Sequence, residues 1–111
     1  MKKSNVFAFI ELSKLVETLK NDSRHPNLKE KLKSQSSYFN IIDAKYFSDG
    51  LTDEWIDLQK TATRMGIMRD EAGFVVMNAV RHTIENMTEE ECATLVNRIY
   101  SIADKVKKEF E

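Results

Sequence analysis

Residues that could hold a metal ion are few in this chain and poorly spaced. Asp53 and Asp57 lie four residues apart, but they share a predicted helix whose apolar face turns them outward. His82 and Glu85 are three apart, as a helical metal pair would be, yet with two His in the whole chain a second such pair is impossible. The sequence therefore predicts no metal site and no cofactor.

Cys92 is the candidate nucleophile, because it lies in the first turn of a predicted helix. A helix N-terminus can lower a thiol pKa, but the preceding Glu89, Glu90 and Glu91 oppose that effect. No His is close in sequence, and no glycine loop that could cradle a phosphate is present. The pattern favours a buried structural thiol, and nothing in it supports an enzyme.

Residues 58–67 resemble the first helix and turn of a helix-turn-helix, with Ala62 and Gly66 four apart and Ile67 after them. The resemblance implies a DNA-reading second helix. Its outward residues would be Met68, Arg69, Asp70, Gly73, Phe74 and Met77. Because only Arg69 of these suits base edges in a major groove, we favour an ordinary helical corner with a glycine cap.

Charge is unevenly distributed along the chain, although the formal net charge is only −1. Residues 1–50 hold nine Lys and Arg against six Asp and Glu, a balance of +3, and residues 51–111 have a balance of −4. One basic patch is predicted around the first interhelical turn: Lys20, Arg24, Lys29, Lys31 and Lys33. It could bind nucleic acid or an acidic partner, but no aromatic residues alternate with the cations, so a solvated helix face is favoured.

A surplus of apolar residues gives the other candidate surface. Four Met residues and Phe74 cluster in residues 65–87, and Met68 and Phe74 fall off the main stripe of their predicted helix. Exposed Met and Phe side chains suit a partner groove or self-association. The alternative, deep burial of that helix, is equally compatible with the pattern. The predicted protein-binding residues are Met68, Phe74 and Met77.

Five helices would position these residues. Helical periodicity predicts helices over about 4–20, 26–46, 52–65, 70–86 and 88–110, the second loosened near Ser34–Ser37 and the fourth at the centre of the core. The last begins with a capping box, Thr88 to Glu91. One helix running from 52 to 86 is the alternative, but Gly66 and Gly73 each cost about 1 kcal/mol inside a helix.

These features predict a fold class and a broad function. A chain of 111 residues with three Gly and one Pro fits a single all-α domain over 1–111, a compact antiparallel bundle of four to five helices. Glu11 and Lys14 interrupt the N-terminal apolar run, so we expect no signal peptide, no membrane span and a cytoplasmic protein. The predicted function is a non-enzymatic, regulatory protein-binding module (adaptor, inhibitor or assembly subunit) whose partner is another protein or a second copy. A nucleic-acid-associated helical module is the alternative.

Overall fold

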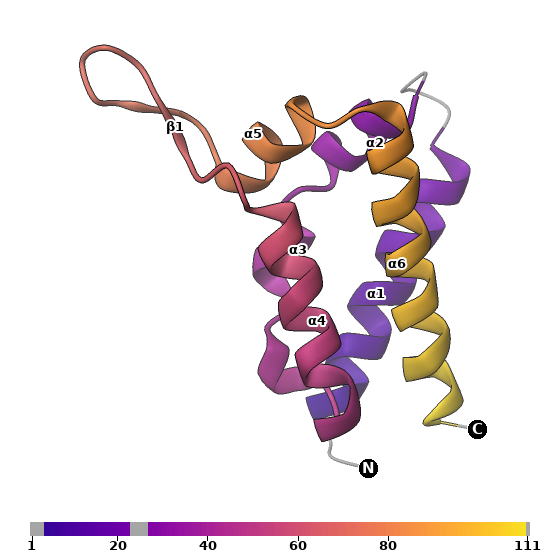
Figure 1. Ribbon diagram of the computed structural model, residues 1–111. Helices are drawn as coiled ribbons and strands as arrows, with labels where there is room; N and C mark the ends of the chain where they lie inside the picture. The colour runs from indigo at the N-terminus through magenta and orange to yellow at the C-terminus, as the bar shows by residue number, and fades with distance from the viewer. Residues whose placement is uncertain (1–3, 23–26, 111) are drawn as a thin grey trace.

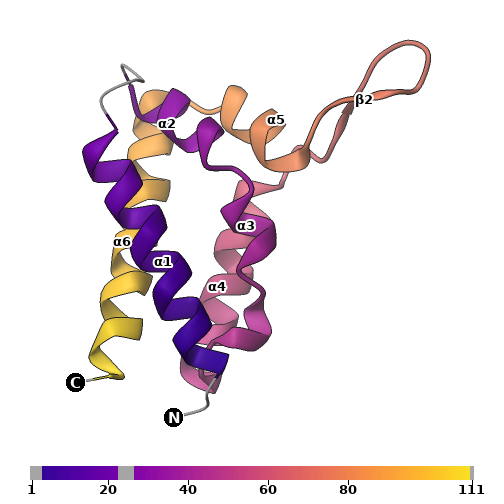
Figure 2. The same ribbon diagram turned by 180° about the vertical axis from the view of Figure 1, so that it is seen from behind.

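Three long helices form the body of the protein in the computed structural model, which describes residues 4–22 and 27–110. These are α1 (Ser4–Asn21), α4 (Asp49–Ala62) and α6 (Glu89–Lys108), and both α1 and α4 pack along α6 (Figures 1 and 2). Shorter elements complete the fold: α2 (Leu28–Ser34), α3 (Tyr38–Ile41), the 3₁₀ helix η1 (Ala44–Tyr46), β1 (Met68–Arg69), β2 (Val75–Met77) and α5 (Ala79–Glu85). The predicted all-α bundle is confirmed, and within the described part it has six α-helices.

The core lies between α6 and the helices around it. The buried stripe of α6 runs along its whole length, from Cys92 to Val106, and α1 faces it with Leu12, Leu15 and Leu19. No helix among the described residues is long and apolar enough to cross a lipid bilayer.

The capping box predicted for the last helix is present and opens α6. Thr88 Oγ1 accepts a hydrogen bond from Glu91 N at 3.0 Å, and Glu91 Oε1 accepts one from Thr88 N at 3.0 Å. Arg64 donates a further bond to the same carboxylate at 2.9 Å. The Thr88 backbone bond, followed by Arg64, lowers the pKa of Glu91 from its ordinary 4.5.

The predicted helix over 26–46 is wrong in part, because it is divided into α2, α3 and η1. It ends first at Gln35, inside the Ser-rich stretch whose helix propensity is low. The bends leave two carbonyl groups unpaired within the segment, and α4 supplies their donors. Trp55 Nε1 donates to Ile42 O at 2.8 Å and Gln59 Nε2 to Phe39 O at 2.9 Å, so α4 fixes this segment in place.

The α4 helix begins three residues before the predicted Thr52, at Asp49, and ends near the predicted position. The helix is capped at Thr63, so the C-terminal cap predicted at Gly66 is wrong; Gly66, with a φ of +68°, turns the chain three residues beyond the cap. A continuous helix from 52 to 86 is therefore wrong.

The predicted helix over 70–86 is also wrong over most of its first half. Only Ala79–Glu85 is helical, and β1 and β2 form an antiparallel hairpin over 68–77 instead. Gly73 has a φ of +89°, which favours a tight turn, and the β-branched pair Val75-Val76 suits a strand. Because Asn78 then caps α5 by accepting from Arg81 N, the helix starts only after the hairpin. Of the segment predicted as the centre of the core, residues 70–78 lie outside the core, whereas Val80 and Ile84 of α5 are buried in it.

Two glycines with equally open surroundings should respond to alanine in opposite directions. No atom would lie within 4 Å of an added Cβ at Gly50 or at Gly66, but only Gly66 has a positive φ. Gly50→Ala, in the first turn of α4, should raise the free energy of unfolding by about 0.5–1 kcal/mol. Gly66→Ala should lower it by about 1–2 kcal/mol. Urea denaturation of both variants measures the contrast, and equal effects would contradict the assigned backbone geometry.

The capping box should also contribute to acid sensitivity. Because the folded pKa of Glu91 lies below its ordinary 4.5, its ionised form stabilises the fold above that pH, and the contribution is lost as pH falls through the folded pKa. Glu91→Gln should therefore flatten the decline of unfolding free energy below about pH 4.5. Glu90→Gln controls for the loss of one negative charge at the same helix end. Identical pH profiles for wild type and Glu91→Gln would refute the assignment.

Candidate functional site

A β-hairpin arm, residues 67–77, projects from the end of the bundle opposite the two termini (Figures 1 and 2). Its strands are paired antiparallel, with Met68 opposite Met77 and Arg69 opposite Val75. Val76 is the extra residue between these pairs, so the ribbon carries a β-bulge near its base. The arm is the most distinctive feature that the bundle displays.

Local hydrogen bonds shape the tip of the arm. The carboxylate of Asp70 accepts from Ala72 N at 2.9 Å and from Phe74 N at 3.0 Å, while Asp70 N donates to Phe74 O at 2.9 Å. The Arg69 guanidinium donates to Gly73 O at 2.8 Å. These are the contacts that an Asp and a Gly typically make in a tight turn. The turn is thus specified by the arm's own residues rather than by packing on the bundle.

The apolar side chains of the arm are largely exposed. Phe74 is 71% exposed, the highest value among the large apolar residues of the described chain, and Met68 is 42% exposed. Met77, the third residue predicted to bind protein, is half-buried at the base. Exposed apolar residues of the arm and its base also include Met65, Ile67, Val75 and Val76.

Sequence reasoning did not find Val75 and Val76, because it placed them inside a helix. The signal that could have found them is local. An Asp and a Gly three residues apart, followed by two β-branched residues, is typical of a turn and a strand.

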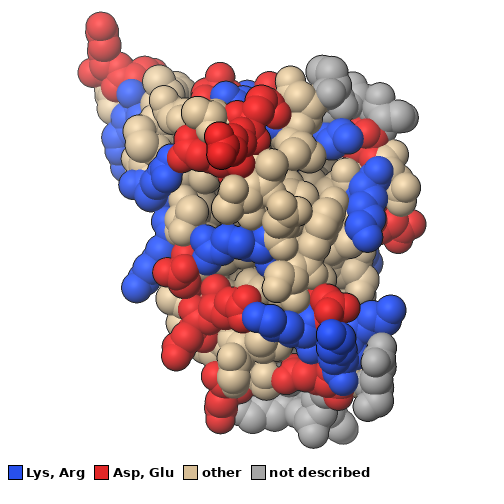
Figure 3. Space-filling model, turned by 45° about the vertical axis from the view of Figure 1, so that its right-hand side comes forward, with Lys and Arg blue, Asp and Glu red and all other residues tan. Residues whose placement is uncertain are grey.

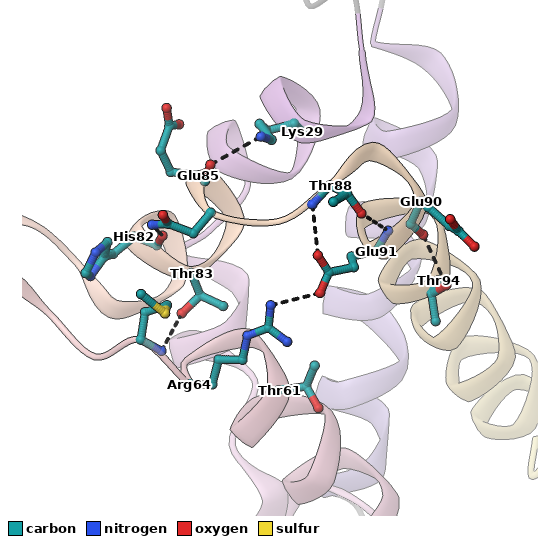
Figure 4. Close-up of polar contacts among 12 residues, drawn as sticks. Lys29, Thr61, Arg64, His82, Thr83, Glu85, Thr88, Glu90, Glu91 and Thr94 are labelled. Atoms are coloured by element: carbon teal, nitrogen blue, oxygen red, sulfur yellow. Dashed lines mark hydrogen bonds and ion pairs between the residues drawn. The ribbon is translucent and has the colours of Figure 1, made fainter.

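Polar contacts fix the base of the arm to the bundle (Figure 4). The buried Thr83 accepts from Met65 N at 3.1 Å and donates to Ala79 O at 2.7 Å. His82 Nδ1 lies 2.9 Å from Gly66 O, and because a carbonyl only accepts, this nitrogen is the donor. These bonds tie Met65 and Gly66, at the root of the arm, to α5. Any motion of the arm is therefore confined to the residues beyond 66.

The sequence-predicted basic patch is partly engaged inside the fold. Lys29 Nζ donates to Glu85 O at 3.2 Å, and Lys33 forms ion pairs with Glu85 and, at 3.7 Å, with Glu30. The hydrogen bond from Lys33 is the main cause of a lowered Glu85 pKa. Lys33 is thus committed to a contact between α2 and α5.

The other members of that patch are not brought together around one site. Lys20 Nζ lies 5.1 Å from the ring centroid of Tyr100, in a cation–π contact with α6. Lys31 is half-exposed on α2, and Arg24 lies outside the described residues. On the face seen in Figure 3, acidic and basic side chains alternate rather than forming a continuous basic field.

The helix-turn-helix that residues 58–67 resemble lacks its second helix. Residues 68–77, which would include the recognition residues, form the arm, and the chain turns at Gly66 between α4 and the arm. A recognition helix cannot be presented to a major groove from this segment.

Two pockets on the bundle are weaker candidates. One of about 250 Å³ lies beside the capping box and includes Arg64, Glu91 and Arg98. The other, of about 440 Å³, lies between α1 and α6 beside Lys20, Tyr100 and Lys107. Both are lined mainly by charged and hydroxyl side chains, whereas small-molecule sites are mostly apolar and enclosed.

The remaining sequence candidates for chemistry do not assemble either. Among residues 4–22 and 27–110, no group of three or more His, Cys, Asp or Glu side chains is placed to hold a metal ion. Cys92 is fully buried, and burial, followed by the charge of Glu89, raises its thiol pKa. A raised pKa disfavours the reactive thiolate.

No protein-family model and no characterised protein matches this sequence, and no solved structure matches its fold. The site must therefore be judged on its own geometry, in which the exposed arm is the feature that bundle packing does not explain.

The turn contacts predict that the arm can be loosened without affecting the bundle. Asp70→Ala removes both side-chain bonds of the turn and should weaken the cross-strand NMR contacts between Arg69 and Val75. The free energy of unfolding should change by less than about 0.5 kcal/mol, because the affected residues are exposed. Glu71→Ala, one residue further along the turn, is the matched control. A loss of more than about 1 kcal/mol would show instead that the arm is part of the cooperative core.

Proposed function

We propose that this protein is a non-enzymatic protein-binding module and that its arm, residues 67–77, is the binding element. The observation that carries the proposal is the exposure of Phe74, which is 71% accessible at the far end of the ribbon. Exposed apolar groups that gather on one protruding element, rather than singly over a surface, are typical of interaction sites.

The energetics of an isolated hairpin support the same proposal. Two strands without a third strand or a covering helix are marginally stable in water. A partner that covers the arm would order it and remove its apolar side chains from water at once. Each Val or Phe side chain that is fully buried contributes about 1.5–3 kcal/mol. A few such contacts are enough for a specific interaction after the cost of association is met.

The charges of the arm favour a protein partner over nucleic acid. Its only cation, Arg69, is bonded to the turn, and the tip carries Asp70 and Glu71. In Figure 3 acidic atoms lie at the far end of the arm. β-Ribbons that bind nucleic acid need cations and donors toward the phosphates, which repel carboxylates. We therefore keep the nucleic-acid function as the alternative, carried only by the basic residues of α1 and α2.

The proposal places the protein in a reducing compartment, the cytoplasm. The chain has one cysteine, Cys92, which is buried and free, so no disulfide between its own residues contributes to its stability. Within this proposal the protein acts as an adaptor, an inhibitor or an assembly subunit, roles that share one requirement, an exposed surface that a partner covers.

Photo-crosslinking from the arm tests the proposal. A benzophenone amino acid replaces Phe74 in the native host, and the same probe replaces Ile41, which is also apolar and 48% exposed but lies on α3. The expected result is one or a few defined covalent adducts to protein from position 74, because a bound partner holds the arm, and none from position 41. Equal, diffuse labelling from both positions would refute the arm as a binding element.

A further inference from the structure

We infer that the partner of the arm is a second copy of this chain, joined by antiparallel pairing of the two β2 strands into one four-stranded sheet. The inference rests on the proposed function, since it names the occupant of the same binding element. It follows from the hydrogen-bonding state of β2, from the charges of the two strand edges and from the apolar area of the arm.

The outer edge of β2 has unpaired backbone groups. Asp70 N donates to Phe74 O, the last cross-strand bond before the turn, while Asp70 O accepts from Gly73 N within the turn. Narrow and wide pairs alternate, and the next pair, Arg69 with Val75, is therefore non-hydrogen-bonded. The N–H and C=O of Val75 thus point away from β1, toward the free edge. An added strand would find both a donor and an acceptor there.

Charge distinguishes the two edges of the ribbon. Pairing two copies through β1 would bring Arg69 close to its own equivalent, and like charges directly opposite are destabilising. The β2 sequence, Val75-Val76-Met77, has no charge and no proline, the two features by which exposed edges usually resist pairing. The β2 edge is therefore the one open to a second strand.

Symmetry makes β2 complementary to itself. A two-fold axis through Val75 places that residue opposite its own equivalent, where the two exchange N–H···O bonds in an antiparallel pair. Phe74 then lies opposite Val76 of the second copy, an aromatic and β-branched pair of the kind that stabilises sheets. The pairing therefore needs no segment from a different protein.

The exposed apolar surface of the arm favours a partner that covers part of it. Six apolar residues of the arm and its base are between 42% and 71% exposed: Met65, Ile67, Met68, Phe74, Val75 and Val76. Together they expose on the order of 500 Å², an apolar patch at the upper end for a monomer. Pairing through β2 covers only the part of this surface on and beside that strand, chiefly Phe74, Val75 and Val76, so the contact is smaller than the roughly 1,000 Å² of a stable complex and the dimer is expected to be weak. The arms project from the bundles, so they can meet before the bundles do (Figure 1).

Sedimentation equilibrium of the full chain over a wide concentration range tests the pairing. Wild type should dimerise, and Val75→Pro, which removes the outward N–H but no ladder donor, should weaken the dimer by roughly tenfold or more. Val76→Lys should do the same by placing a charge on the edge. Ile10→Lys, at an equally exposed apolar position on α1, should dimerise as wild type does. A wild type that stays monomeric at every concentration, or a dimer insensitive to both β2 variants, would overturn the inference.

A cysteine at the axis gives a second readout that does not depend on stability. In a hydrogen-bonded antiparallel pair the Cα atoms are about 5.5 Å apart, within reach of a disulfide. Val75→Cys should therefore oxidise to a covalent dimer. Glu71→Cys should not, because it lies in the turn at the tip of the arm, away from the axis at Val75. The native Cys92 is buried. Equal cross-linking at both positions would overturn the inference.

The two proposals fail separately. If the protein is monomeric and the probe at Phe74 forms adducts only with other proteins, the arm binds a different partner and only self-pairing is wrong. If the probe forms no defined adduct at all, the arm is not a binding element and both proposals fall.

Discussion

The buried stripe of α6 is the constraint on which the rest of the fold depends. It runs from Cys92 to Val106, and α1, α2 and α4 all pack against that helix. Because these three helices pack against the same helix, α6, they surround it and are joined by short connections. The capping box at Thr88 fixes where this stripe begins, and through Glu91 and Arg64 it also fixes the end of α4. The root of the arm, at Met65 and Gly66, is bonded instead to Thr83 and His82 of α5.

A core completed by these helices has no need of residues 67–77. Buried residues occur on α4 up to Ala62 and resume at Val80 in α5, while the residues between them are exposed or half-buried. The chain could join α4 to α5 with a few residues, as most helix connections in small domains do. It instead extends a ribbon that places Phe74 in water. This exposed apolar surface, which adds nothing to the core, is the reason for proposing the arm as a binding element.

The sequence alone predicts the elements that a single local pattern determines. Periodicity and a capping box predict α6, and Gly66 predicts that α4 does not continue into the next segment, because each depends on neighbours in the chain. The break after Ser34 was less predictable, since the seam from Leu28 to Tyr46 is apolar whether or not the helix is continuous. The helix is divided by tertiary contacts, the hydrogen bonds that Trp55 and Gln59 of α4 donate to this segment. The residues of the candidate site were also predicted only in part. Met68 and Phe74 were selected as apolar residues off a helical stripe, and they are exposed because no such helix forms.

The arm's own design explains why its pairing would stop at two copies. An exposed apolar edge usually adds strands without limit, which leads to aggregation. A two-fold pairing of β2 with itself uses the same edge of both copies, so it closes and leaves only the β1 edges free. Each β1 edge is two residues long and carries Arg69, and charge and short length both hinder further addition. The bulge at Val76 adds local twist, which limits how far the regular edge extends toward the base. The asymmetry between the strands, apolar on one side and charged on the other, thus favours a discrete dimer over a fibre.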